Sequence, residues 1–168
     1  MEEPSIRIAQ PADLPRIVEI YNQAIPSKRS TGYTLPVRTE DREVWFAEHD
    51  PGKHPIFVAE LAGIVAGWCS LSAYRPGRMA FRFTAEISHY VDDRYQRRGI
   101  ATALVRYALS ACTKLQIKNV FGILLEPNVA SIRLMEKLGF ELWGRLPHVA
   151  DFDGNEYDHL YFGKRICD

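Results

Sequence analysis

The chain has 168 residues, of which 46% are hydrophobic, and this is enough to build the core of one domain. Basic and acidic residues balance at 21 each, so the formal net charge is zero, and bulk positive charge cannot drive nucleic-acid binding. No apolar run reaches the roughly 20 residues that a membrane-spanning helix needs. We therefore expect a single soluble domain over residues 1–168, with neither nucleic acid nor a membrane as a partner.

The N-terminus and the cysteines indicate the compartment in which the protein works. The opening MEEPSIRIAQ is acidic and lacks the apolar stretch of a secretory signal. Cys69, Cys112 and Cys167 have no metal-ligand spacing, and Cys112 falls on the apolar side of a predicted helix, where it would be a small core residue. We expect reduced thiols, a cytoplasmic location and no metal site.

The first half of the chain predicts a strand, two helices and a hairpin. Apolar residues alternate near the N-terminus and then recur at helical spacing up to Pro26, a residue type that ends helices. The predicted elements are a strand at 5–9, a helix at 10–24, an irregular loop at 26–40, a short helix at 42–49, and hairpin strands at 56–61 and 64–74 with Ala62-Gly63 at the turn.

The second half alternates strands and helices. Apolar positions from Ile100 to Leu115 repeat with helical period, and Gly139 provides a left-handed stop for the helix before it. The predicted elements are strands at 81–91, 119–125, 140–144 and 156–162, and helices at 100–115 and 128–138. This order predicts a mixed α/β fold, with helices packed on the faces of one mixed sheet.

The segment QRRGIATALVRYA, residues 96–108, places two arginines and a glycine at the start of a predicted helix. The first N–H groups of a helix lack partners within it and carry the positive end of its dipole, so they suit a phosphate. Gly99 permits the turn that such a site needs. An ordinary helix start with solvated arginines explains the pattern about as well. Because neither GxxxxGK[ST] nor GxGxxG after a strand occurs, P-loop NTPases and Rossmann dinucleotide folds are disfavoured.

Three stretches together resemble one family. QRRGIA at 96–101 is similar to the Q/R-x-x-G-x-G/A signature of the GNAT superfamily of N-acetyltransferases. FRFTAEISHYV at 81–91 and EPNVASIRLMEKLGF at 126–140 resemble the branch that contains phosphinothricin and methionine sulfoximine/sulfone acetyltransferases. The likeness covers nearly the whole chain. It implies the GNAT fold, a mostly antiparallel twisted sheet of about six to seven strands with helices on both faces and with strands 4 and 5 splayed apart.

The resemblance implies acetyl-CoA as the co-substrate. In the family, backbone N–H groups of the glycine-containing loop hold the diphosphate, backbone groups of the splayed strand hold the thioester and the pantetheine arm, and an asparagine of the next helix also bonds the arm. The corresponding residues here are His89, Tyr90, Val91, Arg97, Arg98, Gly99, Ile100, Ala101, Thr102 and Asn128.

Several of these residues have other readings. Asn128 is a good helix N-cap in any case, and Ser131 is a weaker candidate on the same helix face. His89 replaces the branch's usual valine or isoleucine, and its side chain is interpreted as packing or surface. Where many family members carry a tyrosine as general acid for the thiolate, or the branch a histidine, this chain has Met135, which can donate no proton. The source of the thiolate's proton is therefore open.

Glu86 is the predicted general base. It stands in an otherwise apolar and β-branched strand, where burial would raise its pKa toward the working range of a base. The residues alone favour a half-exposed glutamate paired with a cation such as Arg82. The resemblance reverses that preference, because the glutamate of T-x-E-x-S is the proposed base of the branch.

Phe81, Arg82 and Thr84 are the predicted acceptor-binding residues. Arg82 and Thr84 would share the strand face of Glu86 by period two, and a guanidinium suits a carboxylate. A surface arginine that pairs across strands is an equally good explanation of Arg82. Tyr33, in the loop at 26–40, is a candidate cover for the pocket.

The predicted function is an acetyl-CoA-dependent N-acetyltransferase of a small amino acid or analogue, such as phosphinothricin, methionine sulfoximine or methionine sulfone. Two alternatives stay open. The acceptor could be a protein N-terminus or lysine, or the chain could be an acyl-CoA-binding sensor without turnover. Family members are often dimers, so a homodimer is expected.

Overall fold

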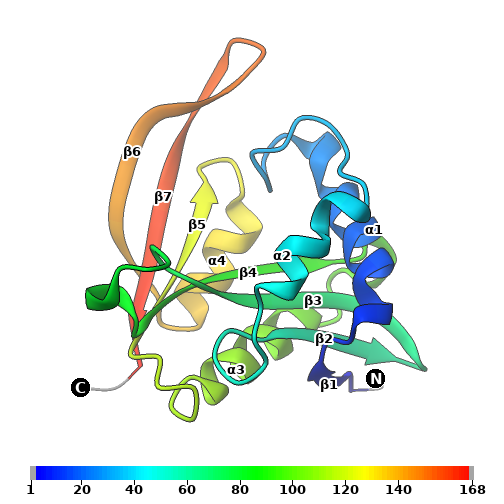
Figure 1. Ribbon diagram of the computed structural model, residues 1–168. Helices are drawn as coiled ribbons and strands as arrows, with labels where there is room; N and C mark the ends of the chain where they lie inside the picture. The colour runs from blue at the N-terminus through cyan, green and yellow to red at the C-terminus, as the bar shows by residue number, and fades with distance from the viewer. Residues whose placement is uncertain (1–2, 167–168) are drawn as a thin grey trace.

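The computed structural model describes residues 3–166, which form one seven-stranded sheet flanked by helices (Figure 1). The sheet order is β1-β2-β3-β4-β5-β7-β6. The strands are β1 (Ser5–Ile8), β2 (Ile56–Leu61), β3 (Ile64–Ala73), β4 (Thr84–Val91), β5 (Asn119–Leu125), β6 (Glu141–Phe152) and β7 (Asn155–Arg165). The helices are α1 (Leu14–Ala24), α2 (Glu43–Ala47), α3 (Ile100–Ala111) and α4 (Val129–Lys137).

All neighbouring strands run antiparallel except β4 and β5, which are parallel and separate halfway along their length. Their pairing ends at Glu86↔Phe121. Beyond that point β4 continues to Val91 beside β3, and β5 continues to Leu125 beside β7. The predicted mixed α/β fold, with splayed strands 4 and 5, is confirmed.

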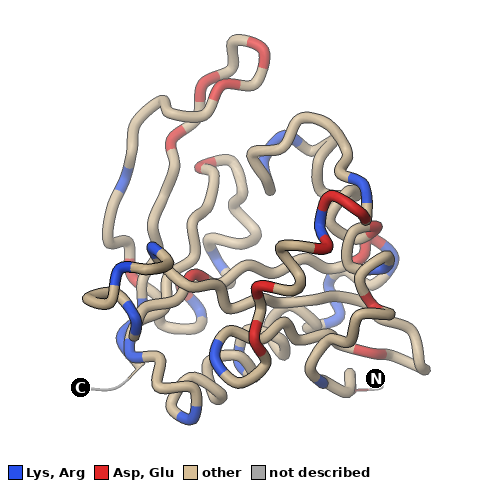
Figure 2. The backbone as a smooth tube through the Cα atoms, viewed as in Figure 1, with Lys and Arg blue, Asp and Glu red and all other residues tan. Residues whose placement is uncertain are grey.

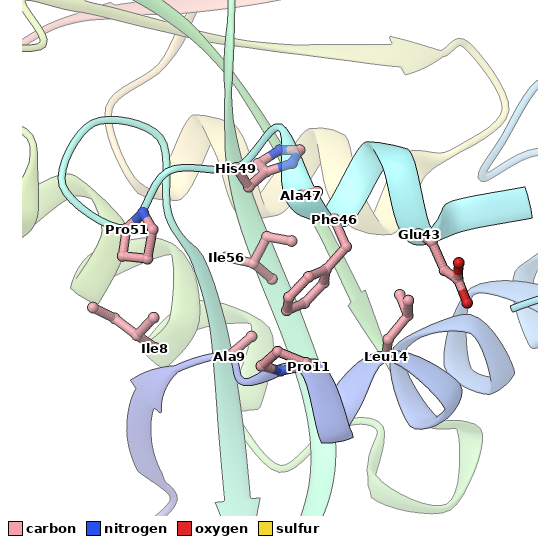
Figure 3. A pocket seen from close by; sticks show the side chains of 10 residues that line it. All are labelled: Ile8, Ala9, Pro11, Leu14, Glu43, Phe46, Ala47, His49, Pro51 and Ile56. Carbon is pink, nitrogen blue, oxygen red and sulfur yellow. The ribbon is translucent and has the colours of Figure 1, made fainter. Parts of the chain in front are cut away.

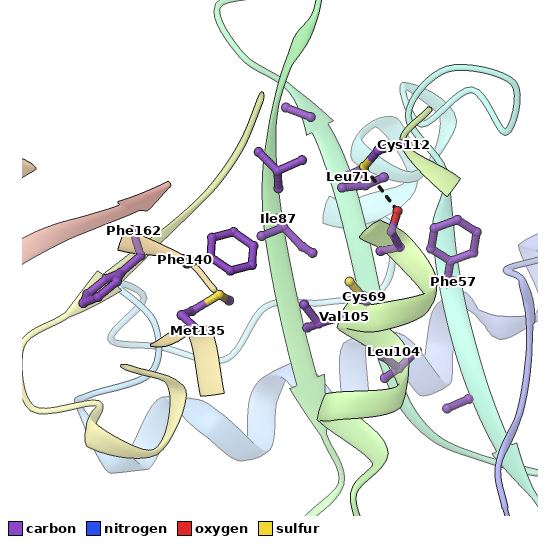
Figure 4. Close-up of a cluster of buried hydrophobic side chains, with 14 of the residues drawn as sticks. Phe57, Cys69, Leu71, Ile87, Leu104, Val105, Cys112, Met135, Phe140 and Phe162 are labelled. Atoms are coloured by element: carbon purple, nitrogen blue, oxygen red, sulfur yellow. Dashed lines mark hydrogen bonds between the residues drawn. The ribbon is translucent and has the colours of Figure 1, made fainter. Parts of the chain in front are cut away.

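Two apolar clusters, one on each face of the sheet, hold the helices. One cluster joins the sheet to α3 and α4 and includes Ile87, Leu104 and Met135 (Figure 4). The other joins it to α1 and includes Ile17 and Trp68. The indole N–H of Trp68 donates to the Ile17 carbonyl at 3.1 Å, so a buried polar contact also fixes α1 on the sheet. The prediction of helices on both faces is confirmed.

Two thiols lie in the cluster beneath α3 (Figure 4). Cys69 and Cys112 are both fully buried, and Cys112 Sγ donates to the Ala108 carbonyl one turn earlier, at 3.2 Å. Burial raises the pKa of the Cys69 thiol far above its ordinary value, which keeps it protonated and unreactive. The interpretation of Cys112 as a core residue is confirmed, whereas Cys167 lies outside the described residues.

Two predicted boundaries near the site are wrong. β4 begins at Thr84 rather than at position 81, because Met79–Phe81 forms a 3-10 turn that leads into the strand. α3 ends at Ala111 rather than at Leu115, because the Cys112 N–H donates to the Leu109 carbonyl three residues back, and turns follow up to Gln116, whose φ is 59°. Residues 81–83 and 112–115 therefore lie outside β4 and α3, and their side chains do not follow the strand or helix faces that the prediction gave them.

The C-terminal hairpin is longer than its sequence pattern indicates. β6 was expected to stop at Gly144 and instead continues to Phe152, in a hairpin that projects beyond the other strands (Figure 1). Asp153 and Gly154 have φ angles of 56° and 88° and form the two-residue turn. Pro147 is tolerated because β6 is an edge strand whose register shifts around it.

Charged residues of both signs are spread along the chain, and acidic residues gather around the β6–β7 turn (Figure 2). Asp153 at that turn accepts a hydrogen bond from Lys28 Nζ at 2.7 Å. The hairpin therefore contacts the loop that follows α1. Among residues 3–166, every helix is too short or too polar to cross a membrane.

Candidate active site

The backbone N–H and C=O groups of β4 point alternately, residue by residue, toward its two neighbouring strands, β3 and β5. The Thr84 carbonyl accepts a hydrogen bond from the Tyr74 N–H at the end of β3, whereas the Phe83 carbonyl accepts one from the Lys118 N–H just before β5. Successive strand residues point their backbone groups to opposite sides. Even-numbered residues of β4 thus face β3, and odd-numbered residues face β5.

Beyond Glu86, β5 has moved away from β4. The N–H groups of His89 and Val91 therefore point into the opening between the two strands. Tyr90, the third residue predicted to bind through its backbone, faces β3, where it pairs with Trp68. Two of the three strand residues assigned to acetyl-CoA can thus donate hydrogen bonds into this opening.

The opening is a cleft of about 800 Å³ between β4, the start of α3 and the start of α4. Nine of the ten residues assigned to acetyl-CoA line it: His89, Tyr90, Val91, Arg97, Gly99, Ile100, Ala101, Thr102 and Asn128. These residues come from segments that are distant in the sequence. A long ligand can contact all of them only by running through the cleft.

The start of α3 presents backbone N–H groups to this cleft. Gly99 is the N-cap, with φ of 80°, and Arg97 also has a positive φ of 61°. The first bond of the helix runs from the Ala103 N–H to the Gly99 carbonyl, at 2.9 Å, so residues 100–102 have N–H groups without a partner inside α3. Left-handed residues that precede a helix start in this way form a concave anion site.

The two arginines before Gly99 lie differently. Arg97 lines the cleft. Arg98 is the one assigned residue that does not, and its guanidinium lies 5.4 Å from the ring centroid of Tyr95. Arg29, in the loop after α1, also lines the cleft, so positive potential there comes from Arg29, Arg97 and the dipole of α3.

Asn128 at the start of α4 has the predicted capping role, because its Oδ1 accepts a hydrogen bond from the Ser131 N–H at 3.3 Å. Ser131 Oγ lies 3.5 Å from His89 Nε2. Burial lowers the pKa of His89 to about 4, so its ring is neutral at physiological pH. Met135 is fully buried in the cluster beneath α4 and does not line the cleft.

The side chain of Glu86 projects from the face of β4 that packs against α1. Its direct partner on β3 is Ser72, and the same side of these strands carries Trp68 opposite Tyr90, two residues that pack against α1. Glu86 is half-buried, and burial raises the pKa of its carboxyl. The carboxylate therefore stands at the point where the sheet opens, on the α1 side.

Aromatic rings pack along the Glu86 face. The ring of Tyr90 lies 4.9 Å from those of Trp68 and Tyr21. The Tyr90 hydroxyl donates to the Ser30 carbonyl at 3.1 Å, which ties the loop after α1 to β4. This cluster lies on the same sheet face as Glu86, and its members are too far apart in the sequence for any local pattern to predict it.

A cation sits among these rings. The Arg42 guanidinium lies 4.9 Å from the Tyr21 centroid, 5.1 Å from that of Tyr33 and 5.3 Å from that of Trp45. Tyr33 itself packs edge-on against Tyr21 at 5.8 Å. The loop at 26–40 thus brings Tyr33 to the Glu86 face and next to a positive charge.

The three predicted acceptor residues are not brought together. Thr84 begins β4 on the face of the candidate base. Arg82 precedes the strand, donates to the Met79 carbonyl at 2.9 Å and lies 4.2 Å from the Phe83 ring centroid. Phe81 belongs to the 3-10 turn and is exposed. The prediction that Arg82 shares a strand face with the base is wrong, because the strand begins after it.

The fold agrees with comparisons to known proteins. Residues 15–140 match the model of the acetyltransferase (GNAT) family. The chain belongs to the GNAT family. It is 37% identical to a candidate phosphinothricin acetyltransferase, YwnH, of Bacillus subtilis, over 96% of this chain and 99% of the relative. It is 34% identical to an L-methionine sulfoximine/L-methionine sulfone acetyltransferase of Pseudomonas aeruginosa, over 92% and 90%.

A solved GNAT structure has the same architecture. A phosphinothricin acetyltransferase from Sinorhizobium meliloti in complex with acetyl-CoA superposes with a TM-score of 0.90, at 28% identity over 98% of this chain and 89% of that one. As a GNAT acetyltransferase, the protein uses acetyl-CoA as its co-substrate. Among residues 3–166 there is no group of three or more His, Cys, Asp or Glu side chains placed to hold a metal ion.

The GNAT domain has a second cavity of about 540 Å³ where α1, α2 and β2 meet (Figure 3). Its lining is mostly apolar and includes Phe46 and Ile56. Glu43 and His49 are the ionisable residues that line it. None of the residues assigned to acetyl-CoA or to the acceptor borders it.

Proposed function

We propose that the protein transfers the acetyl group of acetyl-CoA to the amino group of a small amino acid or a close analogue, with Glu86 as general base. One observation carries the proposal. The half-buried Glu86 is the last residue of β4 that pairs with β5, so it stands next to the point where the two strands separate, one residue before the part of β4 that lines the cleft. A base at that point can reach an amine that attacks a thioester held in the cleft.

The cleft supports the donor side of this reaction. The free N–H groups of residues 100–102 would hold the diphosphate, and Arg97 would add positive charge. The N–H groups of His89 and Val91 would follow the thioester and the pantetheine arm. There they can stabilise the negative charge that develops on the thioester carbonyl oxygen. Tyr90 then belongs to the acceptor side through its ring.

The environment of Glu86 supports the acceptor side. An ammonium group has no lone pair, so it must lose a proton before it can attack a carbonyl carbon. Burial raises the pKa of the Glu86 carboxyl, which makes the carboxylate a better proton acceptor near neutral pH. The proton can pass to Glu86 directly or through one water.

The thiolate can leave without an acid at Met135. Its pKa is near the ~8.5 of an ordinary thiol, so it is a reasonable leaving group that water can protonate. His89 and Ser131 line the same cleft and carry the hydrogen-bond donors that Met135 lacks. These two residues are the protein groups that could assist the thiolate.

A small acceptor fits both the relatives and the Glu86 face. One relative is named for L-methionine sulfoximine and L-methionine sulfone, and another, 32% identical and from Streptomyces viridochromogenes, for phosphinothricin. Rings of Tyr21, Trp68 and Tyr90 crowd this face, where a protein acceptor would need an open groove. The Arg42 guanidinium offers a positive charge that suits the carboxylate of an amino acid.

A thiol-release assay tests the function. The protein is incubated with acetyl-CoA and a panel of amino acids, and free thiol is followed. We expect release with methionine sulfone, methionine sulfoximine or phosphinothricin, and none with peptides. Release with peptides alone would favour a protein acceptor. Tight binding of acetyl-CoA with no release on any amine would favour a sensor and contradict the proposal.

We also infer a homodimer in the cytoplasm. The edge strand β6 exposes four large apolar side chains, Leu142, Trp143, Leu146 and Val149. An exposed apolar edge of this kind is a typical surface for self-association. A reducing compartment fits the buried thiols of Cys69 and Cys112.

A further inference from the structure

His49 and Ser72 form a hydrogen-bonded pair beside Glu86 that the mechanism above does not use. Ser72 is the direct cross-strand partner of Glu86, and the Cβ atoms of such partners lie roughly 5 Å apart on one face of the sheet. His49 follows α2, and its Nε2 lies 2.9 Å from Ser72 Oγ. Its other ring nitrogen, Nδ1, lies 2.7 Å from the Trp45 carbonyl oxygen.

The Trp45 carbonyl determines which of the two residues, His49 or Ser72, donates the hydrogen bond between them. A carbonyl oxygen can only accept, so Nδ1 of His49 carries the proton. Burial lowers the pKa of His49, so the ring is neutral at physiological pH, and Nε2 carries a lone pair and no proton. Ser72 therefore donates its single proton to Nε2. The lone pairs of Ser72 Oγ are left for a donor on the Glu86 face.

We propose that Ser72 Oγ binds the amino group of the acceptor together with Glu86, and that His49 is a positioning residue that keeps Ser72 an acceptor. The inference deepens the proposed function and rests on it. An ammonium group has three N–H donors and needs acceptors on more than one side. The carboxylate of Glu86 and the hydroxyl oxygen of Ser72 supply two, from adjacent strands and on the same face.

The sheet order gives this pair a role in orientation. Ser72 lies on β3, whereas the cleft opens on the opposite side of β4. N–H groups held by Ser72 and Glu86 are therefore held away from the cleft. The proton that Glu86 takes leaves the lone pair on the Glu86 side of the nitrogen, so the amine must turn or invert before this lone pair faces the thioester. The hydrogen bond to Ser72 holds the amine beside the cleft while it does so. A serine that donated to Glu86 instead would compete with the amine for the carboxylate.

Three variants test the pair with methionine sulfone as acceptor. Ser72→Ala removes the oxygen, and His49→Phe keeps a ring against Trp45, 4.7 Å away, but removes the acceptor nitrogen. Each should lower kcat/KM for methionine sulfone about 10-fold. The double variant should be no worse than either single one, because the two residues act as a unit. KM for acetyl-CoA and the melting temperature should stay unchanged.

Two further variants serve as controls. Ser72→Thr keeps a hydroxyl and should recover most of the activity lost in Ser72→Ala. His54→Phe removes another half-buried histidine from the same loop and should change nothing. Losses that add up in the double variant, or that appear in KM for acetyl-CoA, would overturn the assignment.

A binding experiment separates this inference from the proposed function. In calorimetry on the CoA-bound protein, methionine sulfone should bind more tightly than its analogue without the amino group. Ser72→Ala should reduce this difference, and the part that remains is due to Glu86. If no amine is acetylated but this difference is found, the catalytic proposal fails and the binding pair stands. If the wild-type protein does not distinguish the two compounds, the binding pair fails even where turnover is normal.

Discussion

At the residue scale, the proposed chemistry depends on the carboxylate of Glu86. Glu86→Gln keeps the shape of the side chain and removes the base, so kcat should fall by about 10²–10⁴-fold. KM for acetyl-CoA should change little, because the donor cleft is built mainly from backbone groups of other residues. Steady-state thiol release measures both constants. Glu141→Gln, an exposed glutamate on β6, is the control. An unchanged rate in Glu86→Gln would discard the assignment.

The pH dependence of kcat/KM provides a second check on Glu86. Its folded-state pKa is raised by burial, so the active carboxylate is lost at a higher pH than for an exposed glutamate, whose pKa is about 4.3. The rate should therefore fall on the acid side at a pH above that value. Glu86→Gln should lack this acid limb in its residual activity. An identical limb in the variant would assign it to another group.

Single residues differ in how far the sequence alone can place them. Glu86 was singled out by its match to the T-x-E-x-S glutamate of the acetyltransferase branch, because the strand pattern alone favours an ordinary half-exposed glutamate. Arg82 was misplaced because its face depends on where β4 begins, and the 3-10 turn before it has no clear local signal. His49 and Ser72 meet only because β3 passes beneath the end of α2, so spacing along the chain does not indicate their contact.

At the scale of elements, the start of α3 should decide affinity for the donor. Gly99→Ala forces a side chain into φ of 80°, which should cost about 1 kcal/mol of stability and distort the N–H groups that follow. The dissociation constant for CoA, measured by calorimetry, should rise about 10-fold as charge-assisted hydrogen bonds are lost.

Gly63 provides the matched control for this prediction. It has φ of 76° in the β2–β3 turn, and a Cβ at either glycine would meet open space. Gly63→Ala should therefore lose similar stability and keep its affinity for CoA. Equal affinity losses in both variants would show that strain, and not the anion site, is responsible.

Burial explains which elements the sequence predicted well. β2 and β5 have the predicted bounds, because both are buried and appear as short apolar runs. β6 is an exposed edge strand, so its apolar patterning is weak, and the predicted strand at 140–144 covers only its first part. The Asp153-Gly154 pair was the usable signal, since this dipeptide favours a two-residue hairpin turn and would have extended both strands toward it.

At the scale of the whole molecule, a buried carboxylate joins α1 to the end of β4. Asp92 is completely buried and accepts hydrogen bonds from Arg16 and Gln23 of α1, and from Arg94 at 2.9 Å. Arg16 also donates to the Val65 carbonyl at 3.0 Å. These contacts fix the helix that carries the acceptor side of the site against the strand that carries the base.

Asp92→Asn should lower the free energy of unfolding by about 3 kcal/mol, because it leaves arginine charge without its partner. Hydrogen bonds from Arg94 and Arg16 lower the pKa of Asp92 below its unfolded value. Its contribution is thus present above the unfolded pKa and is lost as pH falls through the acid range. Denaturant unfolding at pH 7 and at pH 3, which is below the unfolded pKa of about 3.9, should show a smaller difference between variant and wild type at pH 3. Asp93→Asn, an exposed neighbour, is the control.

The edge strand β6 is the surface through which we expect two copies of the chain to join. β6 ends the strand order, and Val149 on it is 55% exposed. If two copies join through this strand about a two-fold axis, each Val149 lies in the interface, and a charge there is desolvated twice. Wild-type protein should therefore have the mass of a dimer in light scattering, and Val149→Lys that of a monomer. Leu35→Lys, at a 75% exposed leucine in the loop after α1, should remain dimeric. A monomeric wild-type protein would contradict the inferred homodimer. A dimeric Val149→Lys variant would show that the interface lies elsewhere.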